Sequence, residues 1–169
     1  MVMAGHNTRR KEEIIKRFKG LAQNRHYWRT RNRYYYDEQT RYFRFLIPEG
    51  LRVLELGCGA GDLLHALKPK RGVGVDFSSN MVQIASERYP DLEFRLSDIE
   101  ELESWGETFD VLLLSDLIGH LQDVEETFRR LRAFCRPDTR IMISYYNFLW
   151  EPVLKLSLIH ISEPTRLRR

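Results

Sequence analysis

The sequence predicts an α/β fold in which a parallel sheet of about five strands carries helices on both faces. Short apolar segments alternate with helical segments from residue 52 onward, the pattern of repeated strand–helix units. One segment, residues 109–114, is almost wholly apolar, as expected for a strand buried on both faces. A glycine-rich stretch follows the first apolar segment, at the position where open parallel sheets bind ligands.

The strands are expected where short apolar runs stand between turn-forming residues. They are residues 52–56, 72–75, 92–96, 109–114 and 140–145. The helices are expected where apolar residues recur at three- and four-residue spacing. They are residues 62–67, 79–88 and 124–134. The middle helix ends at Tyr89-Pro90, and the last one should turn Val124, Phe128 and Leu131 inward.

A helical extension is expected before the sheet. Residues 8–21 are helix-forming, and Asp37 can cap a second helix that reaches about Leu46. The extension is basic, because residues 1–46 hold 12 Lys and Arg against 4 Asp and Glu, whereas residues 47–155 hold 12 against 19. Such an arm suits contact with nucleic acid or anionic lipid. The alternative is a solvated helix packed on an acidic domain.

The composition fits one globular domain and excludes several protein classes. The chain has 169 residues, of which 43% are hydrophobic. It has no apolar run near the roughly 20 residues that span a bilayer, and no apolar signal core. Its two cysteines, Cys58 and Cys135, lack zinc-type spacing, so no metal site is expected. A reducing, cytoplasmic location fits this cysteine content.

The strongest functional pattern is the loop after the first strand. Gly57, Gly59 and Gly61 form a G-x-G-x-G sequence, with Glu55 before it and Asp62 after it. A dinucleotide loop needs G-x-G-x-x-G, and Asp62 stands where its last glycine belongs. Carboxylates repel a pyrophosphate but attract a cation such as the sulfonium of S-adenosylmethionine. An NAD-dependent oxidoreductase is therefore the disfavoured alternative.

Over residues 48–155 the sequence resembles the class I S-adenosylmethionine-dependent methyltransferase family. The resemblance rests on the glycine loop, on acidic residues that follow three successive strands, and on residues 109–116 and 135–140. It implies a Rossmann-like doubly wound sheet, S-adenosylmethionine as cofactor, and a set of cofactor-binding residues. These are Glu55, Gly57, Cys58, Gly59, Gly61, Asp76, Phe77, Ser78, Met81, Asp98, Ile99 and Ser115.

The same resemblance implies individual roles. Asp76 would bind the ribose hydroxyls, and Asp98 would accept a hydrogen bond from the adenine amino group. Taken singly, either residue could instead be an ordinary turn or capping carboxylate. Cys58 is interpreted as a small filler of the loop rather than a nucleophile.

Candidates for the chemistry itself are Asp116 and His120, which follow the fourth strand. An oxygen acceptor must lose a proton, and the ordinary imidazole pKa of about 6.5 suits His120 as the base. The alternative is that His120 only packs over the cofactor or caps a helix. Tyr34 and Tyr35 are candidates for a lid or substrate contact, or else pack on the sheet.

The predicted function is methyl transfer to a small-molecule, glycan or lipid-linked acceptor, at oxygen. The alternatives are a cofactor-binding module without turnover and a nucleic-acid methyltransferase. The absence of an Asn-Pro-Pro-Tyr motif after the fourth strand argues against amino groups of nucleic acid. Residues 145–152 resemble methyltransferase modules joined to bacterial glycosyltransferases, which suggests a fused or partner glycosyltransferase.

Three segments are predicted. Residues 1–47 form the basic, aromatic helical extension, and residues 48–155 form the methyltransferase domain. Residues 156–169 resemble a translated sequencing adapter and are interpreted as a non-native tail, the alternative being a natural arginine-rich tail. On this interpretation the last two strands of the family fold are missing, and the incomplete domain can be unstable or inactive.

Overall fold

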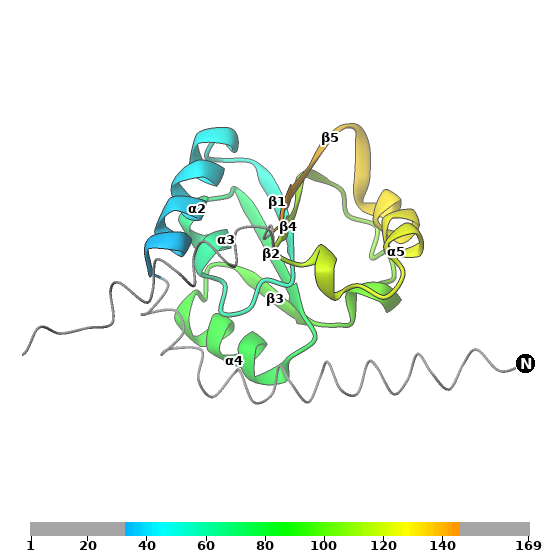
Figure 1. Cartoon of the computed structure of the whole chain (residues 1–169), viewed down its shortest axis with the longest axis horizontal. Coiled ribbons are helices and arrows are strands. Elements are labelled where there is room, and N and C mark those ends of the chain that lie inside the picture. The colour runs from blue at the N-terminus through cyan, green and yellow to red at the C-terminus, as the bar shows by residue number, and fades with distance from the viewer. Residues whose placement is uncertain (1–32, 146–169) are drawn as a thin grey trace, which may run out of the picture.

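The computed structural model describes residues 33–145, and these form a five-stranded sheet with helices on both faces (Figure 1). Every neighbouring pair of strands is parallel, and the strand order is β3-β2-β1-β4-β5. The strands are β1 (Arg52–Leu56), β2 (Arg71–Asp76), β3 (Glu93–Leu96), β4 (Phe109–Ser115) and β5 (Cys135–Ser144). The predicted α/β, doubly wound fold is confirmed.

Four α-helices and three short 3₁₀ helices are present within the described residues. The α-helices are α2 (Arg33–Leu46), α3 (Asp62–Ala66), α4 (Ser79–Arg88) and α5 (Val124–Leu131). The 3₁₀ helices are η1 (Ile99–Glu101), η2 (Ile118–His120) and η3 (Arg132–Phe134). In Figure 1 α2, α3 and α4 lie on one side of the sheet and α5 on the other. None of the helices in residues 33–145 is long and apolar enough to cross a bilayer.

Each face of the sheet has its own apolar core. On the α5 side, Leu131 and Phe134 pack on strand residues such as Leu54 and Leu112, which are all 0–1% exposed. On the other side, Phe43 and Ile47 from α2 and its C-terminal end pack with α3 on the strands. The predicted N-terminal extension is therefore packed on the sheet over its last residues.

The strand register brings the carboxyl ends of the strands to one edge. Leu56 of β1 is paired with Val75 of β2 and with Leu114 of β4, so the residue that follows each one lies at the same level. At the outer strands, Leu96 is paired with Asp76 and Ser144 with Ser115. We call this the carboxyl edge of the sheet. The predicted site residues at strand ends are thus neighbours in space.

The opposite edge, at the amino ends of the strands, holds a cluster of ion pairs. Glu107 accepts hydrogen bonds from Arg71 at 2.9 Å and from Arg52 at 2.7 Å, and Arg71 also pairs with Glu93. The hydrogen bond from Arg71 is the main cause that lowers the pKa of Glu107, against the opposing effect of burial. Likewise, Arg71 lowers the pKa of Glu93.

Helix α2 differs from its prediction because Asp37 is not its N-cap. The helix already includes Arg33, and Asp37 lies inside it, where its carboxylate forms an ion pair with Arg33 one turn earlier at 3.3 Å. A capping carboxylate and an i, i+4 ion-pair partner look the same in a sequence. The residues before 33, including the predicted helix over residues 8–21, lie outside the described residues.

The other differences concern α5 and β5. The inward position predicted for Val124 is wrong, since this side chain is 39% exposed, whereas Thr127 is buried. Thr127 can be buried because its hydroxyl donates to the carbonyl of Asp123 at 2.7 Å. Strand β5 begins at Cys135 and not at residue 140 as predicted, because an irregular pairing with β4 extends it toward its N-terminus. The Thr139 hydroxyl supports this pairing by donating to the carbonyl of Phe109 at 2.6 Å.

Candidate functional site

The glycine loop between β1 and α3 has a backbone that only glycine adopts easily. Gly57, Gly59 and Gly61 have φ angles of 72°, 54° and 76°, in the left-handed region. A Cβ on Gly61 would also lie 2.6 Å from the ring of Phe94. The N–H of Gly57 donates to the carbonyl of Val75 at 2.8 Å, which ties the loop to β2. The predicted loop therefore turns tightly at the carboxyl edge.

Asp76 fixes the glycine loop from the end of β2. One carboxylate oxygen accepts the N–H of Gly59 at 2.8 Å, and the other accepts the N–H of Ser78 at 2.9 Å. The side chain is only 6% exposed. A buried carboxylate needs such donors, and these two hold its plane in one orientation. Both Gly59 and Ser78 belong to the predicted cofactor site.

Asp98 stands at the same edge, beyond the end of β3. Its carboxylate accepts the N–H of Glu100 at 2.9 Å and so caps the short helix η1. The preceding residue, Ser97, donates its N–H to the carbonyl of Asp76 at 3.1 Å. Asp98 is half-buried, whereas Ile99 is 5% exposed and belongs to the core on the α5 side. Asp98 is thus a helix-capping carboxylate, which was the alternative to a role in cofactor binding.

Asp116, the first residue after β4, is the centre of a hydrogen-bond network. Its φ of 52° is unusual for a residue other than glycine. Its carboxylate accepts the hydroxyl of Tyr35 at 2.7 Å and the side-chain amide of Gln39 at 2.9 Å, both from α2. The hydroxyl of Ser144, the last residue of β5, lies 3.1 Å from the other carboxylate oxygen. Three distant segments therefore meet at Asp116.

The structure separates the two tyrosines that were predicted together. Tyr35 contacts Asp116, whereas Tyr34 is 80% exposed on the neighbouring face of α2. His120 is also exposed, and its backbone N–H donates to the carbonyl of Leu117 at 2.9 Å to close η2. Of the candidates for catalysis and substrate contact, Tyr35 and Asp116 are thus brought into direct contact at the carboxyl edge, the part of which around Asp116 we call the rim.

The remaining predicted residues are buried or half-buried. Cys58 is 5% exposed, which agrees with its interpretation as a loop filler, and Met81 is 4% exposed in α4. Glu55 is 2% exposed in β1, directly before the loop. Phe77 and Ser115 are half-buried at the ends of β2 and β4.

The fold agrees with comparisons to known proteins. The family described as the methyltransferase domain matches residues 27–165. This chain belongs to that family. Ubiquinone biosynthesis O-methyltransferase of Rhizobium etli is 36% identical over 106 residues, which cover 59% of this chain and 42% of that protein. Phosphoethanolamine N-methyltransferase 1 of Arabidopsis thaliana is 34% identical over 118 residues, which cover 64% of this chain and 24% of that protein. The chain thus spans less than half the length of these relatives.

Solved structures give the same result. An S-adenosylmethionine dependent methyltransferase from Mesorhizobium loti is 25% identical, with a TM-score of 0.56 over 62% of this chain and 50% of that chain. DhpI, solved as a complex with SAH, shares the fold with a TM-score of 0.63 at 20% identity, over 76% of this chain and 66% of that chain. The expected membership of the class I methyltransferase family is confirmed.

Asp62 follows the glycine loop and was expected to repel a pyrophosphate bound there. In the structure of this methyltransferase domain it contacts the end of α4. Its carboxylate accepts the Tyr89 hydroxyl at 2.7 Å and the Arg88 guanidinium at 2.9 Å, both at the end of α4. The charge of Asp62 is therefore balanced by Arg88. Glu55, Asp76 and Asp98 remain as the acidic residues of the edge that would repel a pyrophosphate.

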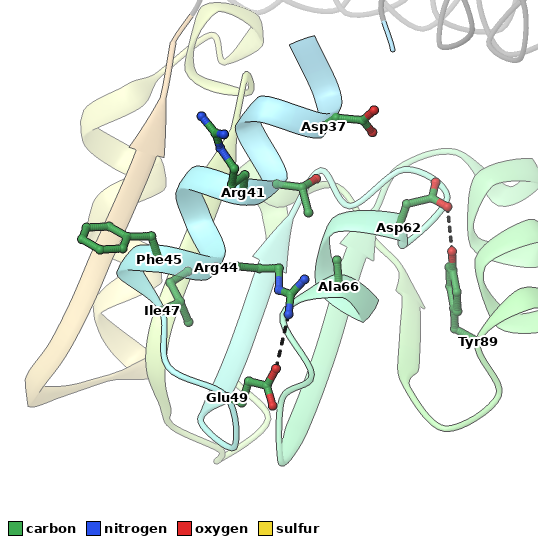
Figure 2. A pocket seen from close by; sticks show the side chains of 10 residues that line it. Asp37, Arg41, Arg44, Phe45, Ile47, Glu49, Asp62, Ala66 and Tyr89 are labelled. Atoms are coloured by element: carbon green, nitrogen blue, oxygen red, sulfur yellow. Dashed lines mark hydrogen bonds and ion pairs between the residues drawn. The ribbon is translucent and has the colours of Figure 1, made fainter. Parts of the chain in front are cut away.

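A cleft of about 630 Å³ lies elsewhere, between α2, α3 and the end of α4 (Figure 2). None of the predicted cofactor, catalytic or lid residues lines it. Two pairs of its polar side chains contact each other, Arg44–Glu49 at 3.5 Å and Tyr89–Asp62 at 2.7 Å, as Figure 2 shows. This cleft is therefore separate from the carboxyl edge.

Gln39 and Ser144 are the rim residues that the sequence did not indicate. Gln39 is 77 positions from Asp116, and Ser144 is 28 positions from it. A glutamine in a helix and a serine in a strand carry no local sign of a shared partner. The pairing of β5 with β4 brings Ser144 to Asp116, and the packing of α2 on the sheet brings Gln39 there.

Proposed function

We propose that this domain binds S-adenosylmethionine at the carboxyl edge and transfers its methyl group to a small-molecule acceptor. The observation that carries the proposal is the strand register, which gathers the glycine loop, Asp76 and Asp98 at one edge of the sheet. Family membership and the acidic character of the edge agree with this function. Because the matched relatives are much longer, the activity of the whole protein is part of the proposal.

The side chains present at the edge suit this cofactor. The N–H groups of Gly59 and Ser78 hold the Asp76 carboxylate in one orientation at the glycine loop. A carboxylate has two acceptor oxygens, which suits a pair of ribose hydroxyls. Asp98, whose carboxylate caps η1 at the same edge, is the acceptor that we propose for the adenine amino group. The glycines of the loop let a ligand approach the backbone closely.

The charges at the edge also match the cofactor, which carries a sulfonium and an ammonium. Glu55 and Asp76 are acidic, and both are buried at the loop. When bound, S-adenosylmethionine supplies an already activated methyl group. The residues of this chain then need to align the acceptor and exclude water.

For the acceptor we propose a small molecule that is methylated at oxygen. The relatives include enzymes named for methylation at oxygen and at nitrogen, so an oxygen acceptor is the finer part of the proposal. The support is chemical: an imidazole such as that of His120 can take up the proton that an attacking hydroxyl loses. His120 lies four residues after Asp116 on the same rim.

The test is a binding measurement followed by a turnover measurement. Calorimetry should detect S-adenosylmethionine and S-adenosylhomocysteine, and should detect no NAD. Asp76→Ala should weaken both cofactor ligands at least tenfold, because two fixed acceptors are lost. Unchanged affinity in this variant would refute the assignment. The acceptor is then tested by release of S-adenosylhomocysteine with phosphoethanolamine against a set of small phenols. Binding without turnover on either would favour the non-catalytic module.

Several sequence-based expectations stay predictions. They are the domain boundaries at residues 47 and 155, the non-native tail over residues 156–169, the glycosyltransferase partner and the cytoplasmic location. The tail and most of residues 145–152 lie outside the described residues.

A further inference from the structure

Three side-chain donors from distant segments surround the Asp116 carboxylate. One carboxylate oxygen accepts the Tyr35 hydroxyl at 2.7 Å and the Gln39 amide at 2.9 Å. The other lies 3.1 Å from the Ser144 hydroxyl. Because a carboxylate only accepts hydrogen bonds, these contacts fix the direction of all three donors. Tyr35 must give its single proton to Asp116.

The backbone of Asp116 is held by the same partner. Its φ of 52° lies in the left-handed region, which residues other than glycine adopt rarely, although aspartate does so more often than most. The N–H of Asp116 lies 3.1 Å from the Ser144 hydroxyl oxygen and 3.2 Å from the Ser144 carbonyl. Ser144 therefore holds both the backbone and the side chain of Asp116.

Gln39 completes the arrangement from α2. Its side-chain nitrogen is within hydrogen-bond distance of Asp116, of the Ser144 hydroxyl at 3.1 Å and of the Tyr35 hydroxyl at 3.3 Å. This single amide thus links the helix, the end of β4 and the end of β5. Gln39 is half-buried, whereas Tyr35 is 39% exposed and reaches the solvent side of the rim.

We propose that Gln39 and Ser144 are positioning residues that fix the Asp116 carboxylate and thereby direct the Tyr35 hydroxyl toward the methyl acceptor. The inference rests on the proposed function. Since the Tyr35 hydroxyl donates its proton to Asp116, its phenolic oxygen can accept a hydrogen bond from the substrate. A hydroxyl or amino group of the substrate that is to be methylated can donate to that oxygen. In this arrangement Asp116 orients Tyr35, and removal of the acceptor proton falls to another group.

Two pairs of variants test the roles of Ser144 and Gln39. Ser144→Thr and Ser144→Val have nearly the same shape and both suit a strand, but only threonine keeps the hydroxyl. Gln39→Met keeps the length of the side chain and removes its amide. Its matched control is Gln83→Met on α4, which also removes an amide bonded to a carboxylate one turn away, at 2.8 Å.

The main readout is the acceptor kcat/KM, measured with the phenol or phosphoethanolamine that the wild-type chain methylates. Ser144→Val and Gln39→Met should lower it about 10- to 100-fold, as expected when an orienting contact is displaced by about an ångström. Ser144→Thr and Gln83→Met should stay within about threefold. Affinity for S-adenosylhomocysteine, measured by calorimetry, should change less than about threefold in all four variants.

A second readout does not depend on turnover. Hydrogen exchange of the Asp116 amide in the unliganded protein should be faster in Ser144→Val than in Ser144→Thr. Equal exchange and equal acceptor kcat/KM in these two variants would overturn the inference and leave the proposed function intact. If the wild-type chain binds no S-adenosylhomocysteine, the proposed function fails first and this inference fails with it.

Discussion

Replacing Asp76 with asparagine removes one negative charge from the carboxyl edge while keeping the shape of the side chain. In the wild-type chain both carboxylate oxygens accept backbone N–H groups, from Gly59 at 2.8 Å and from Ser78 at 2.9 Å. Asparagine has one carbonyl oxygen and one NH₂ group. Whichever way it turns, one of these N–H groups faces another donor.

The size of the effect follows from this mismatch. A hydrogen bond to a charged group contributes about 1.5–3 kcal/mol, and a buried unsatisfied donor costs about 1–3 kcal/mol. Because Asp76 is only 6% exposed, water cannot fully replace the lost acceptor. We expect Asp76→Asn to lower the free energy of unfolding by about 2–3 kcal/mol, or roughly 5–10 °C in Tm. S-Adenosylhomocysteine affinity should fall about 10- to 100-fold.

Asp98→Asn is the matched control, because it makes the same chemical change at the same edge. Asp98 accepts one N–H, that of Glu100 at 2.9 Å, as the cap of η1. Asparagine caps about as well as aspartate, so the change removes at most one hydrogen bond, the one proposed to the adenine amino group. We expect a Tm within about 2 °C of wild type and a loss of affinity below about tenfold.

Thermal unfolding and calorimetric titration of S-adenosylhomocysteine measure both effects on the same samples. Equal Tm and equal affinity in Asp76→Asn and Asp98→Asn would contradict the role given to the two acceptor contacts of Asp76. A drop in Tm without a loss of affinity would keep the structural role of Asp76 and reject its contact with the cofactor.

Two further perturbations test the loop and the ion-pair cluster. Gly61→Ala should destabilise the domain by about 2–4 kcal/mol in urea unfolding, because its Cβ would lie 2.6 Å from Phe94 at a φ of 76°. Gly106→Ala has a similar φ of 78° but open space around it, so it should cost only about 1–2 kcal/mol, and equal losses would reject the steric argument. Because the Arg71 hydrogen bond lowers the pKa of Glu107 in the folded state, its stabilisation is present above the ordinary value of 4.5 and is lost as pH falls below it. Glu107→Gln should flatten unfolding free energy against pH below about 4.5, and an unchanged slope would contradict this assignment.

The sequence predicted the parts of the fold that depend on local patterns. The apolar run of β4 and the proline that ends α4 gave nearly correct boundaries, because burial on both faces and a proline restriction act on neighbouring residues. The glycine loop was predicted for the same reason, since its positive φ angles require glycine at Gly57, Gly59 and Gly61.

The parts that the sequence did not predict depend on contacts between distant segments. Asp37 was expected to begin α2 because a helix-capping aspartate and an ion-paired aspartate are alike in sequence. Asp62 looked like a ligand-facing carboxylate, and only the structure shows that Arg88 balances its charge. The contacts of Gln39 and Ser144 with Asp116 have no local signal at all.

Helix α2 and the residue that follows it also decide where the chain can be shortened. Phe43 and Ile47 are 3% and 1% exposed, and both belong to the apolar core on the α3 side of the sheet. Burial of side chains of this size contributes about 1.5–3 kcal/mol each. A version that starts at residue 48 would therefore open the core over Val53 and Leu64, and would also lose Tyr35 and Gln39 from the rim. Residues 43 and 47 thus contribute to the apolar core, and residues 35 and 39 to the network around Asp116.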